Sequence, residues 1–158
     1  MMADLTEKVA GDKIELHTLV PAQTEPHDWE PSTTDMVKLE QADLLILNGA
    51  GMESWSDQII DSLNNPNLTV VTASDGIQLL EQDGHADPHV WLSPQNAKQE
   101  MENIKNALVE LDPANQAFYQ ANYSSYAEQF DQLDQTFHQQ LDNLTTVSYT
   151  HLICVINE

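Results

Sequence analysis

The chain has 158 residues, of which 41% are hydrophobic, so it is long enough and apolar enough to form one ordinary globular domain. Its formal net charge of −21 comes from 26 Asp and Glu against 5 Lys and Arg, and it would repel nucleic-acid phosphates and anionic lipid headgroups. The N-terminal sequence has no apolar run of the length of a signal peptide or membrane span. We therefore expect neither nucleic-acid binding nor a membrane span in this chain.

The first half of the chain predicts alternating strands and helices. In chain order the patterns predict a helix at residues 3–10 closed by Gly11, a strand at Ile14–Val20, a helix from a capping box at Ser32–Asp35 to about Gln41, a strand at Asp43–Leu47, a helix at Glu53–Leu63 and a strand at Leu68–Thr72. Alternation of this kind is typical of an α/β fold with a parallel sheet and flanking helices.

The second half predicts two helices. Ser93-Pro94 is a cap followed by proline at the first helical position, and the helical pattern continues to Leu111. After Pro113, apolar residues recur at spacings of three and four along one stripe: Tyr119, Tyr123, Tyr126, Phe130, Leu133, Phe137, Leu141 and Leu144. A helix of about thirty residues is about 45 Å long. We interpret it as a backbone helix that packs across one lobe and carries the chain into another, and a bundle arm is the alternative.

Two short segments of similar sequence, Glu25–Pro31 and Asp87–Pro94, carry the main chemical signal. Each contains an acid, a proline, a histidine, any residue and a tryptophan, and each ends in a proline. Proline fixes its own φ and biases the preceding residue toward extended backbone, so His27 and His89 lie on stiff loops. An imidazole that is already held in place loses little entropy on coordination. The repeated pattern therefore predicts a site for a divalent transition metal.

Both histidines follow predicted sheet elements, and the loops at the carboxyl ends of strands are where open α/β sheets bind ligands. We therefore expect His27 and His89 on one rim of the sheet. Cys154 is the only cysteine, so a thiolate cage is excluded and a metal must be bound by nitrogen and oxygen. The groups expected to assist the two histidines, as hydrogen-bond acceptors or by attracting the cation, are Glu25, Asp28, Asp87 and His85.

Two other classes of function remain open. A zinc-dependent hydrolase would use the same histidines with a flanking carboxylate as general base, but the sequence has no His-Glu-x-x-His helix and no Gly-x-Ser-x-Gly elbow. Dinucleotide binding is suggested by Gly49-Ala50-Gly51, which follows a predicted strand and opens a helix. Ser54 stands where the third glycine of that motif belongs, so this pattern is incomplete.

Three motifs in order resemble a known family. Leu19–Pro31, Asn48–Glu53 and Asp87–Pro94 together resemble the metal-binding solute receptors of bacterial ABC importers, most closely the zinc-binding lipoproteins of the AdcA and ZnuA type. The resemblance extends over Leu5–Leu144. It implies two α/β lobes joined by one long rigid helix, with the metal between the lobes and two ligands from each lobe.

The resemblance divides the chain into parts. Residues 1–112 correspond to the first lobe without its opening strand, residues 113–144 to the connecting helix, and residues 145–158 to the start of the second lobe or to a tail unrelated to the family. His27 and His89 correspond to the two first-lobe ligands. His151 is the nearest counterpart of the third ligand, although its neighbours match poorly, and the fourth ligand, a carboxylate, has no counterpart. The resemblance thus implies half of a metal site.

The resemblance also implies a role outside the cytoplasm. A receptor of this type, cell-surface or periplasmic, binds a metal ion tightly and passes it to the permease of an ABC importer without being an enzyme. Three histidines and one carboxylate suit tetrahedral zinc, whereas added carboxylates and waters suit manganese. Leu92-Ser93-Pro94 is closer to the zinc receptors, while the loop before it lacks their His-rich tract. We expect zinc as the cargo, with manganese as the alternative.

Overall fold

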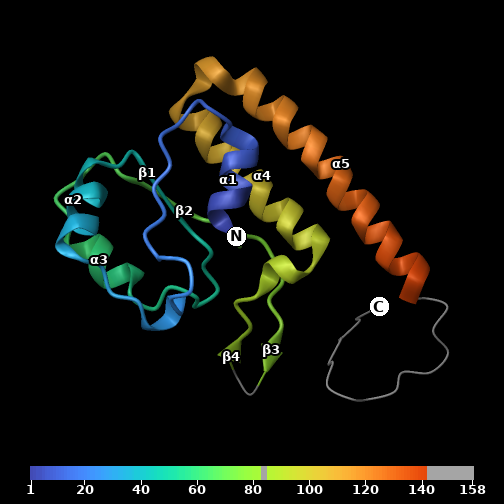
Figure 1. The fold of residues 1–158 in the computed structure, drawn as a ribbon, viewed down its shortest axis with the longest axis horizontal. Coiled ribbons are helices and arrows are strands. Elements are labelled where there is room, and N and C mark those ends of the chain that lie inside the picture. Colours follow the sequence, from blue (N-terminus) through green and yellow to red (C-terminus); the bar gives the residue numbers. More distant parts are fainter. Residues whose placement is uncertain (83–84, 142–158) are drawn as a thin grey trace.

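The computed structural model describes residues 1–82 and 85–141, without the side chains of Asp28, Gln82 and His85. Helices surround a small parallel sheet (Figure 1). The helices are α1 (Met2–Ala10), α2 (Thr33–Gln41), α3 (Ser56–Ser62), α4 (Pro94–Leu111) and α5 (Gln116–Leu141), with 3-10 turns η1 (Pro26–Asp28), η2 (Val90–Leu92) and η3 (Pro113–Asn115). The strands are β1 (Leu44–Leu47), β2 (Thr69–Thr72), β3 (Glu81–Gln82) and β4 (His85–Ala86).

The sheet formed by β1 and β2 confirms two of the predicted strands and their parallel arrangement. Its register pairs Leu44 with Thr69 and Leu47 with Thr72, so both strands end at the same edge. The turn after β1 therefore begins at this carboxyl edge, next to the end of β2. The polar loop predicted for Glu81–Asp87 contains the short antiparallel hairpin of β3 and β4.

The strand predicted for Ile14–Val20 is wrong, because this segment joins no sheet in the described part of the chain. A cavity of about 1250 Å³, here called the sheet cavity, is lined by residues 13–24 and by residues 41–48. Strands must lie about 4.8 Å apart to form ladder hydrogen bonds. Both the segment and β1 line the sheet cavity, and among the described residues β1 pairs only with β2. Half-buried Ile14 and Leu16 still alternate with exposed neighbours, so the pattern reported burial correctly but not pairing.

The predicted helix boundaries agree closely with the structure where a cap defines them. Ser32 and Asp35 form a complete capping box at the start of α2, with each side chain bonding the backbone N–H of the other residue. Gly11, at φ 55°, follows the last residue of α1. Helix α3 begins at Ser56, three residues later than Glu53, because Glu53 lies in the turn after β1 and caps the N–H groups there.

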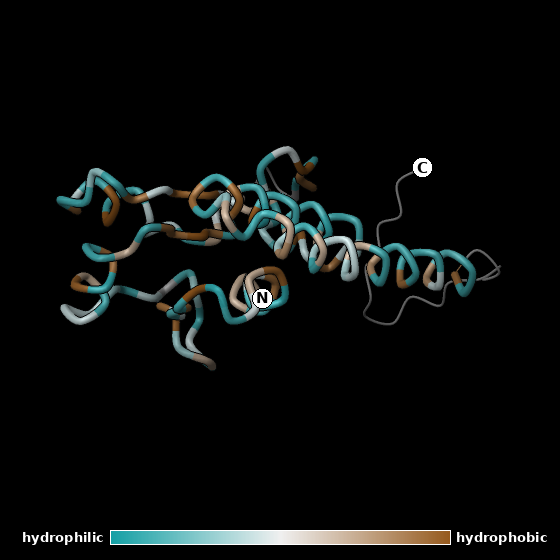
Figure 2. The backbone as a smooth tube through the Cα atoms, turned by 90° about the horizontal axis from the view of Figure 1, so that it is seen from above, coloured by the Kyte–Doolittle hydropathy of each residue, from teal (hydrophilic) through white to brown (hydrophobic). Residues whose placement is uncertain are grey.

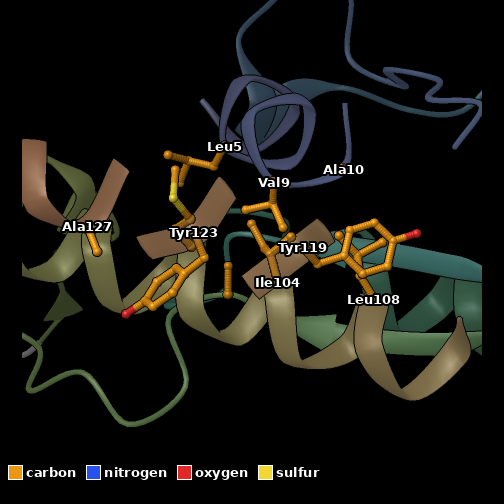
Figure 3. Close-up of a cluster of buried hydrophobic side chains, with 10 residues drawn as sticks. Leu5, Val9, Ala10, Ile104, Leu108, Tyr119, Tyr123 and Ala127 are labelled. Atoms are coloured by element: carbon orange, nitrogen blue, oxygen red, sulfur yellow. The ribbon is translucent and has the colours of Figure 1, made fainter. Parts of the chain in front are cut away.

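Helices α1, α4 and α5 pack together into a unit that we call the helical layer (Figure 3). Its buried residues come from all three helices and from the loop after β2: Leu5, Val9, Ala10, Ala73, Met101, Ile104, Leu108, Tyr119, Tyr123 and Ala127. A second, smaller cluster, the sheet-side cluster, joins α2, β1 and α3 through Leu39, Leu45, Leu47 and Ile59. The predicted α/β class with one long helix is therefore confirmed.

The long helix α5 has 26 residues and buries only the first part of its predicted stripe. Tyr119 and Tyr123 are buried against α1 and α4, whereas Leu133, Phe137 and Leu141 are 42 to 43% exposed. Figure 2 shows the far end of α5 projecting beyond the rest of the described chain. Within residues 1–82 and 85–141, no helix combines the length and apolar content needed to cross a membrane.

Candidate metal site

The two motif histidines lie on one cavity at the carboxyl edge of the sheet. His27 and His89 line an open cavity of about 440 Å³, which we call the histidine cavity. The other lining residues are small or apolar: Ala50, Gly51, Leu79, Ala86 and Pro88. Ala50 and Gly51 belong to the turn after β1, which places the cavity at the strand ends. The expected proximity of the two histidines is therefore confirmed, while their role as ligands stays a prediction.

His89 is held in one orientation by Asp87. The carboxylate Oδ1 lies 2.7 Å from the imidazole Nδ1 and also accepts the backbone N–H of His89 at 3.0 Å. These two hydrogen bonds hold the pKa of Asp87 below its ordinary value, and the bond from the backbone N–H has the larger effect. An ionised carboxylate only accepts, so Nδ1 must be the donor, and in the neutral ring Nε2 keeps its lone pair. Nε2 is therefore the nitrogen of His89 that is free to bind a cation.

His27 is held less tightly than His89. It lies in η1, and its Nε2 is 3.9 Å from Glu25 Oε1, which is too far for a hydrogen bond. Its side chain is 41% exposed, compared with 49% for that of His89. Glu25 therefore acts on His27 through charge alone, whereas Asp87 also fixes the geometry of its histidine. Asp28 and His85 were predicted to assist, but their side chains lie outside the described residues, as does the whole of His151.

Two backbone N–H groups at the start of the turn after β1 are already occupied. Glu53 accepts the backbone N–H of Asn48 at 2.9 Å with Oε1 and that of Gly49 at 3.0 Å with Oε2. In a dinucleotide site, N–H groups of such a glycine turn would point at a phosphate. Here a carboxylate fills that position and would repel a second anion. The geometry of this turn therefore argues against dinucleotide binding.

The hydrolase alternative also finds little support in the geometry. Asp87 is bonded to His89 by two hydrogen bonds that favour its ionised form, so it is an orienting group rather than a base aimed at water. Among the described residues, no group of three or more His, Cys, Asp or Glu side chains is arranged to hold a metal ion. Two histidines on one open cavity can instead supply part of a coordination sphere.

Sequence reasoning missed the side chains that hold the two histidine loops in place. Asn48 donates to the carbonyl of Pro88, and Trp55 donates to the carbonyl of Pro26. Trp55 also packs edge-on against Trp29, with ring centroids 4.6 Å apart. The motif containing Asn48 was noticed, but its contact with Pro88 joins residues forty positions apart. No periodicity or spacing in the sequence reports such a contact.

Comparison with known proteins gives a consistent result. Residues 1–152 match the family model described as "ZnuA: Zinc-uptake complex component A periplasmic". The manganese ABC transporter substrate-binding lipoprotein PsaA of Streptococcus pneumoniae is 37% identical over 154 aligned residues, covering 91% of this chain and 50% of PsaA. The high-affinity zinc uptake system protein ZnuA of Bacillus subtilis is 34% identical, covering 86% of this chain and 47% of ZnuA.

A solved structure agrees with the fold. The Zn(II)-bound ZnuA-like domain of Streptococcus pneumoniae AdcA superimposes with a TM-score of 0.82 at 31% identity, covering 90% of this chain and 53% of that domain. The chain thus spans about half the length of the curated relatives it matches. Those relatives are named as transport components rather than as enzymes, and their names include both manganese and zinc.

Proposed function

This chain belongs to the ZnuA family of zinc-uptake components, and we propose that it supplies the first-lobe half of a receptor that captures a divalent transition metal. The observation that carries the proposal is the histidine cavity, which His27 and His89 line from two separate loops and where Asp87 leaves Nε2 of His89 available. The cargo is bound and released unchanged, so no catalytic residue is required. The remaining ligands would come from residues beyond Leu141.

The metal that suits this half-site best is zinc. Neutral imidazole nitrogen is a preferred zinc ligand, whereas manganese favours carboxylates, carbonyls and water. Among the described residues that line the histidine cavity, none is a carboxylate, and the two side chains able to coordinate are histidines. We therefore propose zinc as the cargo. Manganese is the alternative, because PsaA is named as a manganese protein.

The proposed site of action is outside the cytoplasm, with an ABC importer as the partner. A receptor that collects scarce metal must bind it tightly and then hand it to a permease. The name of PsaA contains the words lipoprotein and ABC transporter, and the description of the family model contains the word periplasmic. We propose that this chain, which spans about half the length of PsaA, works in a receptor that delivers its metal to such a permease.

A chelator-competition titration tests this function. Zinc and manganese are titrated into the chain at neutral pH, alongside the double variant His27→Ala, His89→Ala and the single variant His138→Ala. His138 lies on α5 with a side chain 64% exposed, so it controls for the loss of an ordinary surface histidine. We expect one zinc per chain, lost in the double variant and kept in the control. Equal binding by all three proteins would show that the histidine pair is not the site.

The same titration at lower pH gives a second readout. A protonated imidazole cannot coordinate, so zinc affinity should fall as the solution is made acidic. His138→Ala should follow the same pH profile as the unmodified chain. An affinity that stays constant between pH 8 and pH 5 would contradict ligation by histidine.

A further inference from the structure

One segment of the chain contacts the backbone of both histidine loops. Asn48 Nδ2 donates a hydrogen bond of 3.0 Å to the carbonyl of Pro88, and Trp55 Nε1 donates one of 3.1 Å to the carbonyl of Pro26. Each acceptor is the proline directly before a histidine of the candidate site. The two donors lie at the two ends of residues 48–55, here called the brace. Both histidine loops are therefore tied to the same short piece of backbone.

These bonds act on the peptide planes that lead into the histidines. A peptide bond is planar, so holding the carbonyl of Pro88 also holds the N–H of His89, and the same applies to Pro26 and His27. The ring of Pro26 or Pro88 already fixes the φ of that proline. The remaining freedom of each histidine then lies in its own φ and in the rotation of its side chain. In His89, Asp87 restricts that rotation as well.

The brace is itself fixed to the sheet. Asn48 directly follows β1 and is 3% exposed, and Glu53 accepts the N–H groups of both Asn48 and Gly49. Gly49 has φ 82°, and a Cβ there would lie 2.2 Å from Thr72 Cγ2, so the turn sits tightly against the end of β2. At the other end, the ring of Trp55 packs against buried Trp29. Both donors therefore belong to rigid parts of the fold.

We propose that the brace sets the separation and orientation of His27 and His89, and that Asn48 and Trp55 are positioning residues for metal binding. This inference rests on the proposed function, because the spacing of the imidazoles matters only if they share a cation. A bound zinc requires nitrogen atoms at 2.0–2.1 Å, and a site loses affinity when its ligands are displaced by about half an ångström. Asn48 acts on His89 through Pro88, and Trp55 acts on His27 through Pro26.

Two variants each remove the bond to one histidine loop with little change of shape. Asn48→Asp also removes the bond of 2.9 Å that Nδ2 donates to the carbonyl of Gly49. Asn48→Asp is isosteric but loses the amide donor and places an oxygen against the Pro88 carbonyl. Trp55→Phe loses the indole N–H and keeps an aromatic ring beside Trp29. The matched control is Asn65→Asp, since Asn65 Nδ2 donates to the carbonyls of Leu39 at 3.2 Å and Ala42 at 2.8 Å, beyond the opposite end of β1.

The experiment measures zinc affinity by chelator competition and follows each imidazole by ¹⁵N NMR, with signals assigned from His27→Ala and His89→Ala. We expect zinc affinity to fall by about tenfold or more in Asn48→Asp and Trp55→Phe, and to stay unchanged in Asn65→Asp. The zinc-induced shifts should change for His89 alone in Asn48→Asp and for His27 alone in Trp55→Phe. Thermal unfolding of each variant checks that it is folded. If Asn48→Asp does not fold, the brace inference is tested by Trp55→Phe alone.

The outcomes separate the brace from the proposed function. If the chain binds zinc, the double histidine variant loses it, and both brace variants match Asn65→Asp, then the brace inference alone is overturned. The brace inference is also overturned if either brace variant changes the zinc-induced shifts of both histidines equally, because that would indicate a general loss of order in the site. If the double histidine variant binds zinc as well as the unmodified chain, the proposed function fails and the brace inference fails with it.

Discussion

In the helical layer, seven of the ten buried residues are 0 to 1% exposed and the other three are 4 to 9% exposed, whereas all four residues of the sheet-side cluster are 3 to 7% exposed. Leu39, Leu45 and Leu47 of the sheet-side cluster line the sheet cavity, and so do Leu108 and Tyr119 of the helical layer. One region is therefore held by close apolar packing between helices. The other is held to a greater extent by directed hydrogen bonds from side chains to backbone, such as those of the brace.

This difference indicates that the two regions have different roles in the molecule. Close packing of the helical layer gives most of the hydrophobic stabilisation, because the free energy of burial scales with the apolar area removed from water. The histidine loops lie at the edge of the sheet side, where polar side chains set the geometry. We therefore expect core substitutions in the helical layer to lower stability most, and brace substitutions to change metal affinity more than stability.

The largest expected effect comes from truncating the same residue type in both regions. Ile104→Ala should lower the free energy of unfolding by about 4 kcal/mol, because Ile104 is fully buried in the helical layer and its neighbours cannot collapse into the space. Ile59→Ala should cost about 2 kcal/mol, since Ile59 is 7% exposed and belongs to a smaller cluster with fewer buried neighbours. Urea unfolding measures both. Equal losses would contradict the contrast between the two regions.

A second prediction concerns the one buried carboxylate with no hydrogen-bond partner among the described residues. Glu100 on α4 is 0% exposed, and both of its carboxylate oxygens lack partners there. Burial raises the pKa of Glu100 to about 7. Attraction from the N-terminal amino group lowers this pKa, and repulsion from Glu53 raises it, but both effects are smaller than that of burial. Glu100→Gln keeps the shape and removes the charge. It should stabilise the chain by about 3 kcal/mol at pH 8 and have little effect at pH 4.

The sign of this pH dependence follows from proton binding. The pKa of Glu100 in the folded chain lies above the ordinary value of 4.5, so between these values the folded state binds more protons than the unfolded state. Stability is therefore full below about pH 4.5 and falls as the pH rises through about 7. Exposed Glu110 on the same helix provides the control, and Glu110→Gln should leave the profile unchanged. Identical pH profiles for Glu100→Gln and the unmodified chain would exclude this role for Glu100.

The sequence predicted those parts of the fold and site that depend on neighbouring residues. The capping box at Ser32, the proline start of α4 and the stiff loop around each histidine are all set by residues a few positions apart. Asp87 was predicted as an assisting group because it lies two residues before His89. Features of the structure that depend on contacts between residues close in the sequence can therefore be predicted from the sequence.

Contacts between distant residues could not be predicted in this way. The alternation of Ile14–Val20 reported a half-buried face, but whether a strand forms depends on a partner beside it, and among the described residues β1 pairs only with β2. Asn48 and Trp55 reach carbonyls forty and twenty-nine positions away. Glu100 fitted a helical pattern as an ordinary polar residue, and only the packing of the helical layer shows that it is buried. The brace and the buried carboxylate therefore required the structure.

A smaller effect is expected from the caps of two helices, one in each region. Ser32→Ala should cost about 1.5 kcal/mol, because Ser32 and Asp35 exchange hydrogen bonds at the start of short helix α2. Ser93→Ala should cost about 0.5 kcal/mol, since Ser93 accepts a single long bond of 3.4 Å from Asn96 and α4 is held by packing. The free energies of unfolding in urea compare them. A larger loss for Ser93→Ala would show that α4 depends on its cap more than on the helical layer.

The smallest expected effect tests whether charge adds to the packing of α4 against α5. Lys98 Nζ bonds both carboxylate oxygens of Asp131 at 2.7 Å, and these bonds hold the pKa of Asp131 below its ordinary value. The two side chains are 28% and 42% exposed, so water and salt screen the pair. Lys98→Met should lower the free energy of unfolding only slightly at low salt and almost not at all in 1 M NaCl, where the screening length is about 3 Å.

The pH dependence of stability in Lys98→Met checks that the lost stabilisation comes from the ion pair with Asp131. Because the pKa of Asp131 is lowered in the folded chain, the stabilisation is present above the ordinary value of 3.8 and is lost as the pH falls below it. Lys8→Met removes an ion pair with Asp4 inside α1 and should show a similar small loss. A loss of several kcal/mol in Lys98→Met that persists in 1 M NaCl would mean that α5 is anchored by this ion pair, and not by Tyr119 and Tyr123 in the helical layer.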